Sequence, residues 1–361
     1  MTTNVIGAAY ERQLLVLAGV LLLIGLIAIS SASVGFAEAR HSDMWYLSKR
    51  HGVYLLLAFA GAATCYSIPV QFWYRSSWLW LLLTCLLLIL VLIPGVGKNV
   101  NGSQRWLAFA GMTLQPSELA KGAMILYLAG YLQRRSVELQ SSWEGLLRPL
   151  LILGVVALLL MAEPDFGATV IVLATSLGML FLAGMKLVHL LVILAGTAGL
   201  LVALVATAPY RMQRLTAYTD PWADPFGSGF QLVQSLIAFG RGEWFGVGLG
   251  NSVQKLFYLP EAHTDFVFSI WAEESGFIGA SLVIALFLAL VLRIFALGQR
   301  ALSLGQSYAA FFCFGVALMF SGQAFVNMGV SAGLLPTKGL TLPFVSYGGT
   351  SLIASCALLA I

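Results

Sequence analysis

Long apolar segments recur along this chain of 361 residues, and they constrain its fold more than any other feature. Sixty per cent of the residues are apolar and only 9% are charged. A soluble domain of this length needs far more charged surface. The first apolar run, residues 14–29, is long for the core of a signal peptide and is interpreted as a membrane helix. The sequence therefore predicts an integral membrane protein.

Ten segments are candidates for transmembrane helices, which need about 20 apolar residues to cross the hydrocarbon core. Eight of them are 13–33, 52–69, 77–94, 115–132, 187–207, 266–292, 307–330 and 345–361. Two shorter segments, 150–162 and 168–184, flank a polar turn and could be two short spans or a pair that turns back within the membrane. The prediction is an all-α integral membrane protein of about ten transmembrane helices, in a single domain (residues 1–361).

An even number of helices places both termini on one side of the membrane. Eight Lys and Arg residues fall on the terminal side and ten on the other, four of the ten in one long loop (residues 208–265). Long loops carry little weight in the positive-inside rule, so eight against six slightly favours cytoplasmic termini. The long loop is then extracytoplasmic. Apolar residues at helical spacing over 230–238 predict a short amphipathic helix there, lying in the membrane interface.

The densest polar cluster lies where the long loop re-enters the membrane, and it contains Glu261, His263 and Asp265. Asp265 is placed as an N-cap of the eighth helix, which could by itself explain a carboxylate there. The alternative is a general base, since a carboxylate at the edge of a low-dielectric region has a raised pKa. His263 could do the same work, and the sequence barely separates the two.

Glu118 and Lys121 are three residues apart near the start of the fourth helix, after Pro116 at its first position. The pair can form an ion pair on one helix face. It could equally form the wall of a polar cavity, because ionisable groups at membrane depth often mark sites.

Further ionisable residues allow two interpretations each. Arg105 and Lys338 are isolated cations in short loops, either snorkelling to the interface or binding an anion such as a diphosphate. Glu273 and Glu274 could line the same cavity or be paired structurally, whereas residues 163–167 are interpreted as a polar turn. The four cysteines lack metal-ligand spacing, and the net charge of +4 has no basic block, which argues against nucleic acid as a partner.

Several of these segments, in this order, resemble the SEDS family (shape, elongation, division and sporulation). They are 115–121, 260–266, and 335–343 with 346–349. Residues 250–262 resemble the division-type FtsW branch, because the elongation-type RodA branch typically has Arg where Ala262 stands.

The resemblance implies ten helices with cytoplasmic termini in the bacterial cytoplasmic membrane. It also implies a peptidoglycan glycosyltransferase that polymerises lipid II at the division septum. The implied partners are a class B penicillin-binding protein of the FtsI type and the regulators FtsQ, FtsL and FtsB. The essential aspartate of the family corresponds to Asp265, its cavity pair to Glu118 and Lys121, and further polar positions to Arg105 and Lys338.

Glycosyl transfer between two lipid-linked sugars needs a base on the attacking hydroxyl and cations on the departing diphosphate. Asp265 is predicted as the base, with Arg105, Lys121 and Lys338 as the cations and Glu261 and His263 beside it. No cofactor is evident and no set of metal ligands is recognised, although a divalent cation could share the charge. A lipid II flippase, a non-catalytic scaffold and a RodA-type polymerase are the alternatives.

Overall fold

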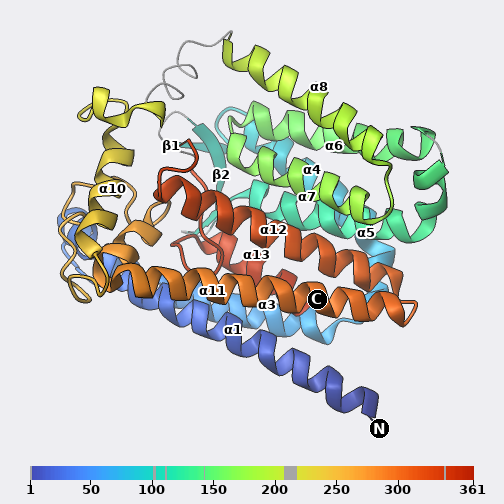
Figure 1. Cartoon of the computed structure of the whole chain (residues 1–361), viewed down its shortest axis with the longest axis horizontal. Coiled ribbons are helices and arrows are strands. Elements are labelled where there is room, and N and C mark those ends of the chain that lie inside the picture. The colour runs from blue at the N-terminus through green and yellow to red at the C-terminus, as the bar shows by residue number, and fades with distance from the viewer. Residues whose placement is uncertain (1, 101–102, 110–111, 142, 207–217, 337–338) are drawn as a thin grey trace.

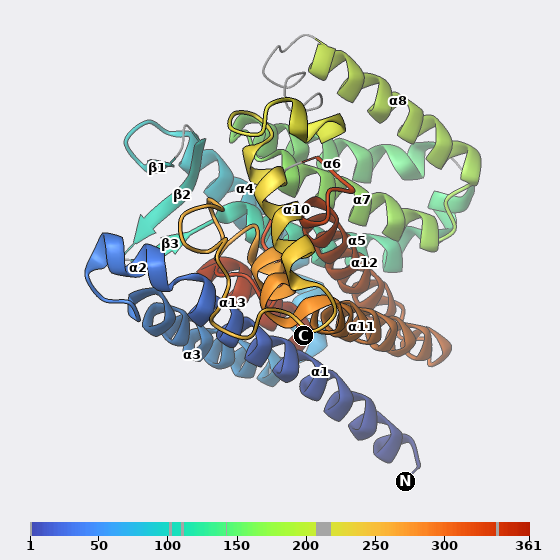
Figure 2. The same ribbon diagram turned by 60° about the vertical axis from the view of Figure 1, so that its left-hand side comes forward.

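The computed structural model of the protein describes residues 2–100, 103–109, 112–141, 143–206, 218–336 and 339–361. Within these ranges the chain forms a bundle of long helices, with a small sheet and α10 gathered at one end (Figures 1 and 2). Ten helices correspond to the ten predicted segments. They are α1 (Thr2–Ala32), α3 (Tyr46–Ser67), α4 (Val70–Leu92), α5 (Pro116–Ser141), α6 (Trp143–Ala162), α7 (Phe166–Leu182), α8 (Leu187–Ala206), α11 (Val267–Ser303), α12 (Ser307–Ser331) and α13 (Gly349–Ala360).

The surface of the bundle is apolar, as expected of a protein that lies in lipid. Leu82, Leu158 and Leu191 are more than half exposed on the outer helices α4, α6 and α8. Central α12, in contrast, buries apolar residues on most of its circumference. Among the described residues five helices are both long and apolar enough to cross a membrane: α1, α4, α6, α11 and α12. The fold is that of a multi-pass membrane protein.

The lengths of the paired helices α6 and α7 favour one of the alternatives left by the sequence. α6 has 20 residues and begins at Trp143, before the predicted start, and α7 has 17. At 1.5 Å per residue these helices are about 30 and 26 Å long, close to the thickness of a hydrocarbon core. Their lengths favour two short crossing helices over a pair that turns back halfway, although of the two only α6 is among the five described helices that are long and apolar enough to cross.

Helix α3 begins six residues before the predicted segment, at Tyr46 rather than 52. Its first turns contain Lys49 and Arg50, which hydropathy excludes from a span. Backbone hydrogen bonds continue past the end of the apolar surface, so a helix extends beyond the span that its composition indicates.

A small antiparallel sheet follows α4, where the sequence indicated only a loop. Its strands are β1 (Gly97–Val100), β2 (Ser103–Phe109) and β3 (Met112–Leu114), in the order β1-β2-β3. Leu107 occupies the middle of the sheet, paired with Gly97 on one side and Leu114 on the other. The strands are too short to give a clear alternating pattern in the sequence. They carry Lys98 and Arg105 to the end of the bundle.

The described part of the long loop, residues 218–265, contains a short 3-10 turn (Pro221–Ala223) and the predicted amphipathic helix, α10 (Phe230–Gly242). The helix does not lie free in an interface, because its apolar residues Leu232 and Val233 are buried and the helix packs on α11. Ser235 Oγ lies 2.6 Å from Ser269 Oγ on α11. Pairing of these polar groups holds α10 on the bundle.

Helix α11 is interrupted at Gly276, where φ is +68° and the backbone is not helical. The loop after α10 takes over the hydrogen bonds that the helix loses there. The amides of Val247 and Gly248 donate to the carbonyls of Glu273 and Glu274 (3.0 and 3.1 Å). In return, the amides of Phe277 and Ile278 donate to carbonyls of residues 243 and 244 (2.8 and 3.2 Å). We call this exchange of four hydrogen bonds the α11 seam.

Glu273 and Glu274 are paired structurally and do not line the cavity described below. Glu273 accepts from Arg241 Nε at 3.1 Å, and Glu274 accepts from Lys255 Nζ at 2.9 Å. Ser31 on α1 donates to Glu274 at 2.5 Å. Both carboxylates therefore fasten the long loop to α11, and Glu274 also contacts α1.

Candidate active site

A cavity of about 730 Å³ opens at the end of the bundle that carries the sheet. Its walls come from the sheet, the starts of α3, α5 and α13, and the segment that precedes α11. A volume of this size is typical of a site for small molecules. Of the predicted site residues, Arg105, Glu118, Glu261 and Asp265 line this cavity.

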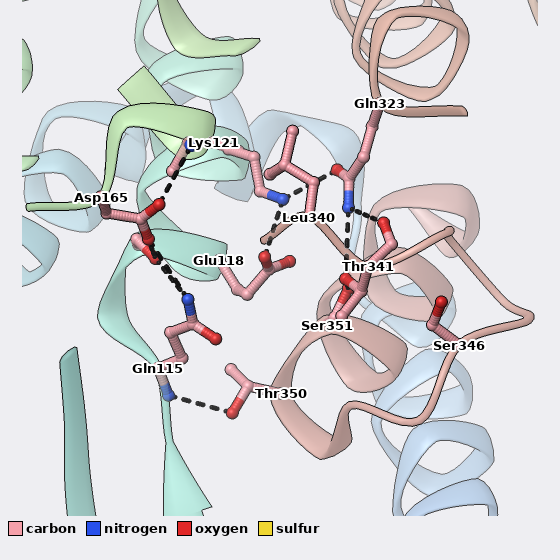
Figure 3. A network of polar contacts seen from close by, with 12 residues as sticks. Gln115, Glu118, Lys121, Asp165, Gln323, Leu340, Thr341, Ser346, Thr350 and Ser351 are labelled. Carbon is pink, nitrogen blue, oxygen red and sulfur yellow. Dashed lines mark hydrogen bonds and ion pairs between the residues drawn. The ribbon is translucent and has the colours of Figure 1, made fainter. Parts of the chain in front are cut away.

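Glu118 and Lys121 form the ion pair that their spacing predicts. Lys121 Nζ lies 2.9 Å from Glu118 Oε1, and both side chains are less than a tenth exposed. Lys121 also donates to Gln323 Oε1 at 2.8 Å, and Gln323 Nε2 donates to the carbonyl of Thr341 at 2.8 Å (Figure 3). Only Glu118 of the pair lines the cavity, so Lys121 lies behind it and links α5 to α12 and to the chain before α13.

Asp165 is a cavity residue, although the sequence indicated only a polar turn at 163–167. Its carboxylate accepts from Ser117 Oγ at 2.8 Å. It also accepts from Gln115 Nε2 at 3.3 Å (Figure 3). It also caps α7 by accepting from the amide of Ala168 at 3.2 Å. Capping and the tie to α5 together fix Asp165 on the wall next to Glu118.

Arg105 projects from β2 onto this turn. Its guanidinium donates to the carbonyl of Glu163 at 3.2 Å and to that of Pro164, and one nitrogen lies 4.0 Å from Asp165 Oδ1. The side chain remains about a fifth exposed toward the cavity. Burial raises the pKa of neighbouring Glu163 to about 8, so this carboxyl is largely neutral at pH 7. The positive charge of Arg105 is therefore only partly offset.

Asp265 lines the cavity just before the start of α11, and the prediction that it is the N-cap of this helix is wrong. The N-cap of α11 is Phe266, which has no side-chain bond, and the helix begins at Val267. The pKa of the Asp265 carboxyl is raised to about 7, mainly by burial and also by the charges of Glu261 and Asp165, while the charge of Arg105 opposes the rise. The carboxyl is thus half ionised near neutral pH, as a general base requires.

The two neighbours of Asp265 differ in position. Glu261, at φ +56°, is exposed in the cavity and accepts from Thr264 Oγ1 at 2.8 Å. His263 is buried between Phe36 and Tyr347, with ring centroids 5.0 and 5.7 Å away, and is not a lining residue. Burial lowers the pKa of His263. Of the two candidate bases, Asp265 lines the cavity and His263 does not.

Lys338 lies outside the residues that the structure describes, but its neighbour Gly339 is placed. A side-chain carbon on Gly339 would lie 3.1 Å from Asp265 Oδ2. Asn327 on α12 holds this segment by donating to the carbonyls of Asp265 and Leu340 (2.9 and 2.5 Å). Glycine therefore leaves open the space directly beside the Asp265 carboxylate.

Sequence reasoning did not identify Arg50, Tyr54 and Tyr347, which also line the cavity. Arg50 lies in the part of α3 that hydropathy excluded, so the one available signal was a cation just before a predicted span. Within the described residues, no three His, Cys, Asp or Glu side chains converge closely enough to hold a metal ion.

A family model described as "Cell cycle protein", named for FtsW, RodA and SpoVE, matches residues 12–361. The chain belongs to the SEDS family. The probable peptidoglycan glycosyltransferase FtsW of Hahella chejuensis is 52% identical over 94% of this chain and 85% of that protein. The FtsW of Alcanivorax borkumensis, also described as a probable peptidoglycan glycosyltransferase, is 50% identical over 100% and 94%.

Solved SEDS structures have the same architecture. One belongs to a study described as "Structural coordination of polymerization and crosslinking by a peptidoglycan synthase complex", with a TM-score of 0.78 at 34% identity, covering 96% of this chain and 94% of that one. RodA of Thermus thermophilus has a TM-score of 0.70 at 30% identity, covering 96% and 93%. The FtsW relatives are thus more similar in sequence than this RodA, in agreement with the FtsW-type prediction.

Proposed function

We propose that this SEDS protein is the peptidoglycan glycosyltransferase that polymerises lipid II at the division septum, with Asp265 as its general base. The observation that carries the proposal is a carboxyl with a pKa near 7 that faces a cavity also lined by Arg105. The names of the FtsW relatives support the reaction type.

The reaction joins two lipid-linked sugars. Asp265 takes the proton of the C4 hydroxyl of one lipid II, and the oxygen attacks the anomeric carbon of the second lipid-linked chain with inversion. The bond from that carbon to the diphosphate breaks, and its electron pair leaves with undecaprenyl diphosphate. Arg105 is the protein cation beside this departing charge, where a positive group lowers the barrier. Both reacting groups come with the substrates, so we propose no organic cofactor.

Glu118, Lys121 and Asp165 do not take part in bond making. They hold the cavity wall and the Arg105 side chain in position for this step. The network Glu118–Lys121–Gln323 fixes the cavity wall, and Asp165 lies within 4.0 Å of the Arg105 guanidinium. Lys338, in the chain segment that leads to Gly339, is proposed as a second cation for the diphosphate.

The membrane orientation follows from this chemistry. Lipid II is polymerised outside the cytoplasmic membrane, so the end of the bundle with the cavity faces outward and both termini are cytoplasmic. The solved complex is described as coordinating polymerization and crosslinking. We propose that this chain likewise acts with a crosslinking partner, a class B penicillin-binding protein of the FtsI type, under regulators of the FtsQ, FtsL and FtsB type.

The decisive experiment replaces the proposed base. Asp265→Asn keeps the size of the side chain. The hydrogen bond from Asn327 goes to the backbone carbonyl of Asp265, so the substitution leaves it in place. Polymerisation of labelled lipid II by the purified complex should fall by about 10² to 10⁴, while protein yield and partner binding stay normal. His263→Gln should be milder.

Other outcomes would change the conclusion. Full polymerisation by Asp265→Asn with an inactive His263→Gln would transfer the role of base to His263. No glycan polymer from the wild-type complex, together with lipid II movement across vesicles, would favour a flippase. The absence of both activities would favour a non-catalytic scaffold.

A further inference from the structure

The cavity has a second cationic wall, which the proposed mechanism does not use. Arg50 lies one turn into α3 and lines the cavity together with Tyr54 and Tyr347. Its guanidinium donates to the Tyr54 hydroxyl at 3.3 Å and lies 5.8 Å from the centre of that ring. Tyr54 is only 4% exposed, so the aromatic ring holds the cation in place at the cavity edge.

Close packing of α3 on α13 builds this wall. A side-chain carbon on Gly349 would collide with the ring of Tyr54, so only glycine lets the start of α13 approach so closely. Tyr347, two residues earlier, meets Tyr54 edge-on with ring centroids 6.4 Å apart. Burial raises the pKa of the Tyr347 hydroxyl to about 12, against the opposing effect of the Arg50 charge. The tyrosine is therefore neutral and can donate to an anion.

Arg50 and Arg105 act on different groups of the cavity, and the charge of Arg50 acts on Tyr54 and Tyr347. The charge of Arg105 acts directly on the Asp265 carboxyl. Arg50 instead adjoins Tyr347, whose amide donates to the carbonyl of His263 at 3.0 Å. Arg50 is thus linked to the segment that carries Asp265 through Tyr347 and the buried His263, whereas Arg105 acts on the carboxyl itself.

The two lipid-linked substrates place their diphosphates at different distances from the base. In the donor, the diphosphate is bonded to the anomeric carbon under attack, so it lies beside the atoms that Asp265 serves. In the acceptor, the attacking hydroxyl and the diphosphate lie at opposite ends of a disaccharide. Arg105, whose charge acts on Asp265, therefore suits the donor diphosphate, and Arg50, a cavity cation that contacts other groups, suits that of the acceptor.

We propose that Arg50, held by Tyr54 and flanked by Tyr347, binds the diphosphate of the acceptor lipid II. This inference rests on the proposed function and assigns one of the two substrate positions in the same cavity. The ligand chemistry is a phosphate ester on a lipid, which an anionic phospholipid headgroup shares.

The test separates acceptor from donor. A lipid II with a blocked C4 hydroxyl serves only as donor, and its coupling to labelled lipid II is followed with the purified complex in neutral, phospholipid-free detergent. For Arg50→Gln the KM for the acceptor should rise about tenfold, because one charge-assisted hydrogen bond to the acceptor is lost. The KM for the blocked donor should stay within about twofold of the wild-type value. Arg50→Lys keeps the charge and should recover part of the difference.

Two controls make the result specific. Lys49 is the residue next to Arg50 on α3, and it is an exposed cation that pairs with Asp43. Lys49→Gln should change neither KM. A soluble disaccharide acceptor without a diphosphate should be used equally by the wild type and Arg50→Gln. This comparison also shows that the variant is folded and catalytically intact.

Three results would overturn the inference. One is an equal rise in both KM values, and another is a larger rise for the donor. The third is an unchanged acceptor KM in phospholipid-free detergent that shifts only when anionic phospholipid is added, which would assign Arg50 to a membrane lipid. A wild-type complex that forms no polymer would instead contradict the proposed function.

Discussion

Asp265 owes its chemistry to residues that are distant in sequence as well as to its neighbours. Arg105 and Asp165 act on its carboxyl from the sheet and from the turn before α7. The sequence could predict the Glu118–Lys121 pair, because three residues along a helix fix the geometry. It could not predict that Asp165 faces the cavity or that Arg50 belongs to it, because their partners lie in other segments.

The raised pKa of Asp265 predicts a pH dependence. As the proposed base, Asp265 works only when deprotonated, so the polymerisation rate should fall as the pH drops below about 7. The negative charge of Glu261 raises this pKa, so Glu261→Gln should move the acidic limb of the profile to lower pH. Rates of the purified complex between pH 5 and 8 would measure the shift. Glu243→Gln, an exposed carboxylate outside the cavity, is the control, and a shift to higher pH in Glu261→Gln would contradict the assignment.

At the scale of elements, the break in α11 was invisible in the sequence. One glycine within an apolar helical pattern is tolerated in many helices, and nothing local distinguishes Gly276 from those. The break exists because the loop after α10 supplies four replacement hydrogen bonds. The sheet was missed for a similar reason, since strands of three to seven residues give little periodicity.

The α11 seam predicts a large cost for a small substitution. A side-chain carbon on Gly276 would collide with the amide nitrogen of Gly246 and the backbone of Trp244, in addition to the strain of φ +68°. Gly305 has φ +75° with open space around it, so Gly305→Ala should cost only about 1–2 kcal/mol for the left-handed backbone. Thermal unfolding in detergent should show a clearly lower midpoint for Gly276→Ala. Equal unfolding midpoints for Gly276→Ala and Gly305→Ala would mean that the loop after α10 moves aside with no loss of stability.

For the whole molecule, hydropathy predicted the ten helices well, because each crossing requires its own apolar run. The cavity could not be predicted in the same way. It is assembled from the sheet, the segment before α11 and the start of α13, which are far apart in the chain and meet only in the folded bundle. The motifs marked which segments matter, but not that Lys121 lies behind Glu118.

The orientation of the molecule can be tested with two exposed serines at opposite ends. Ser228 lies in the long loop before α10, and Ser303 lies at the end of α11. In cells, an impermeant thiol reagent added outside the cytoplasmic membrane should label Ser228→Cys and not Ser303→Cys. The four native cysteines lie within helices, and the unsubstituted protein measures their background. The reverse pattern would place the cavity in the cytoplasm and exclude lipid II polymerisation.

The α11 seam also determines which parts of the chain unfold together. Four amides, two in the loop and two in the helix, are bonded across it, so neither side can open without the other. The loop amides of Val247 and Gly248 should therefore exchange with solvent deuterium as slowly as the helix amides of Phe277 and Ile278, although the loop has no regular structure. The outer turns of α11 and the loop after α10 then unfold as one unit, and Asp265 lies between them in the chain.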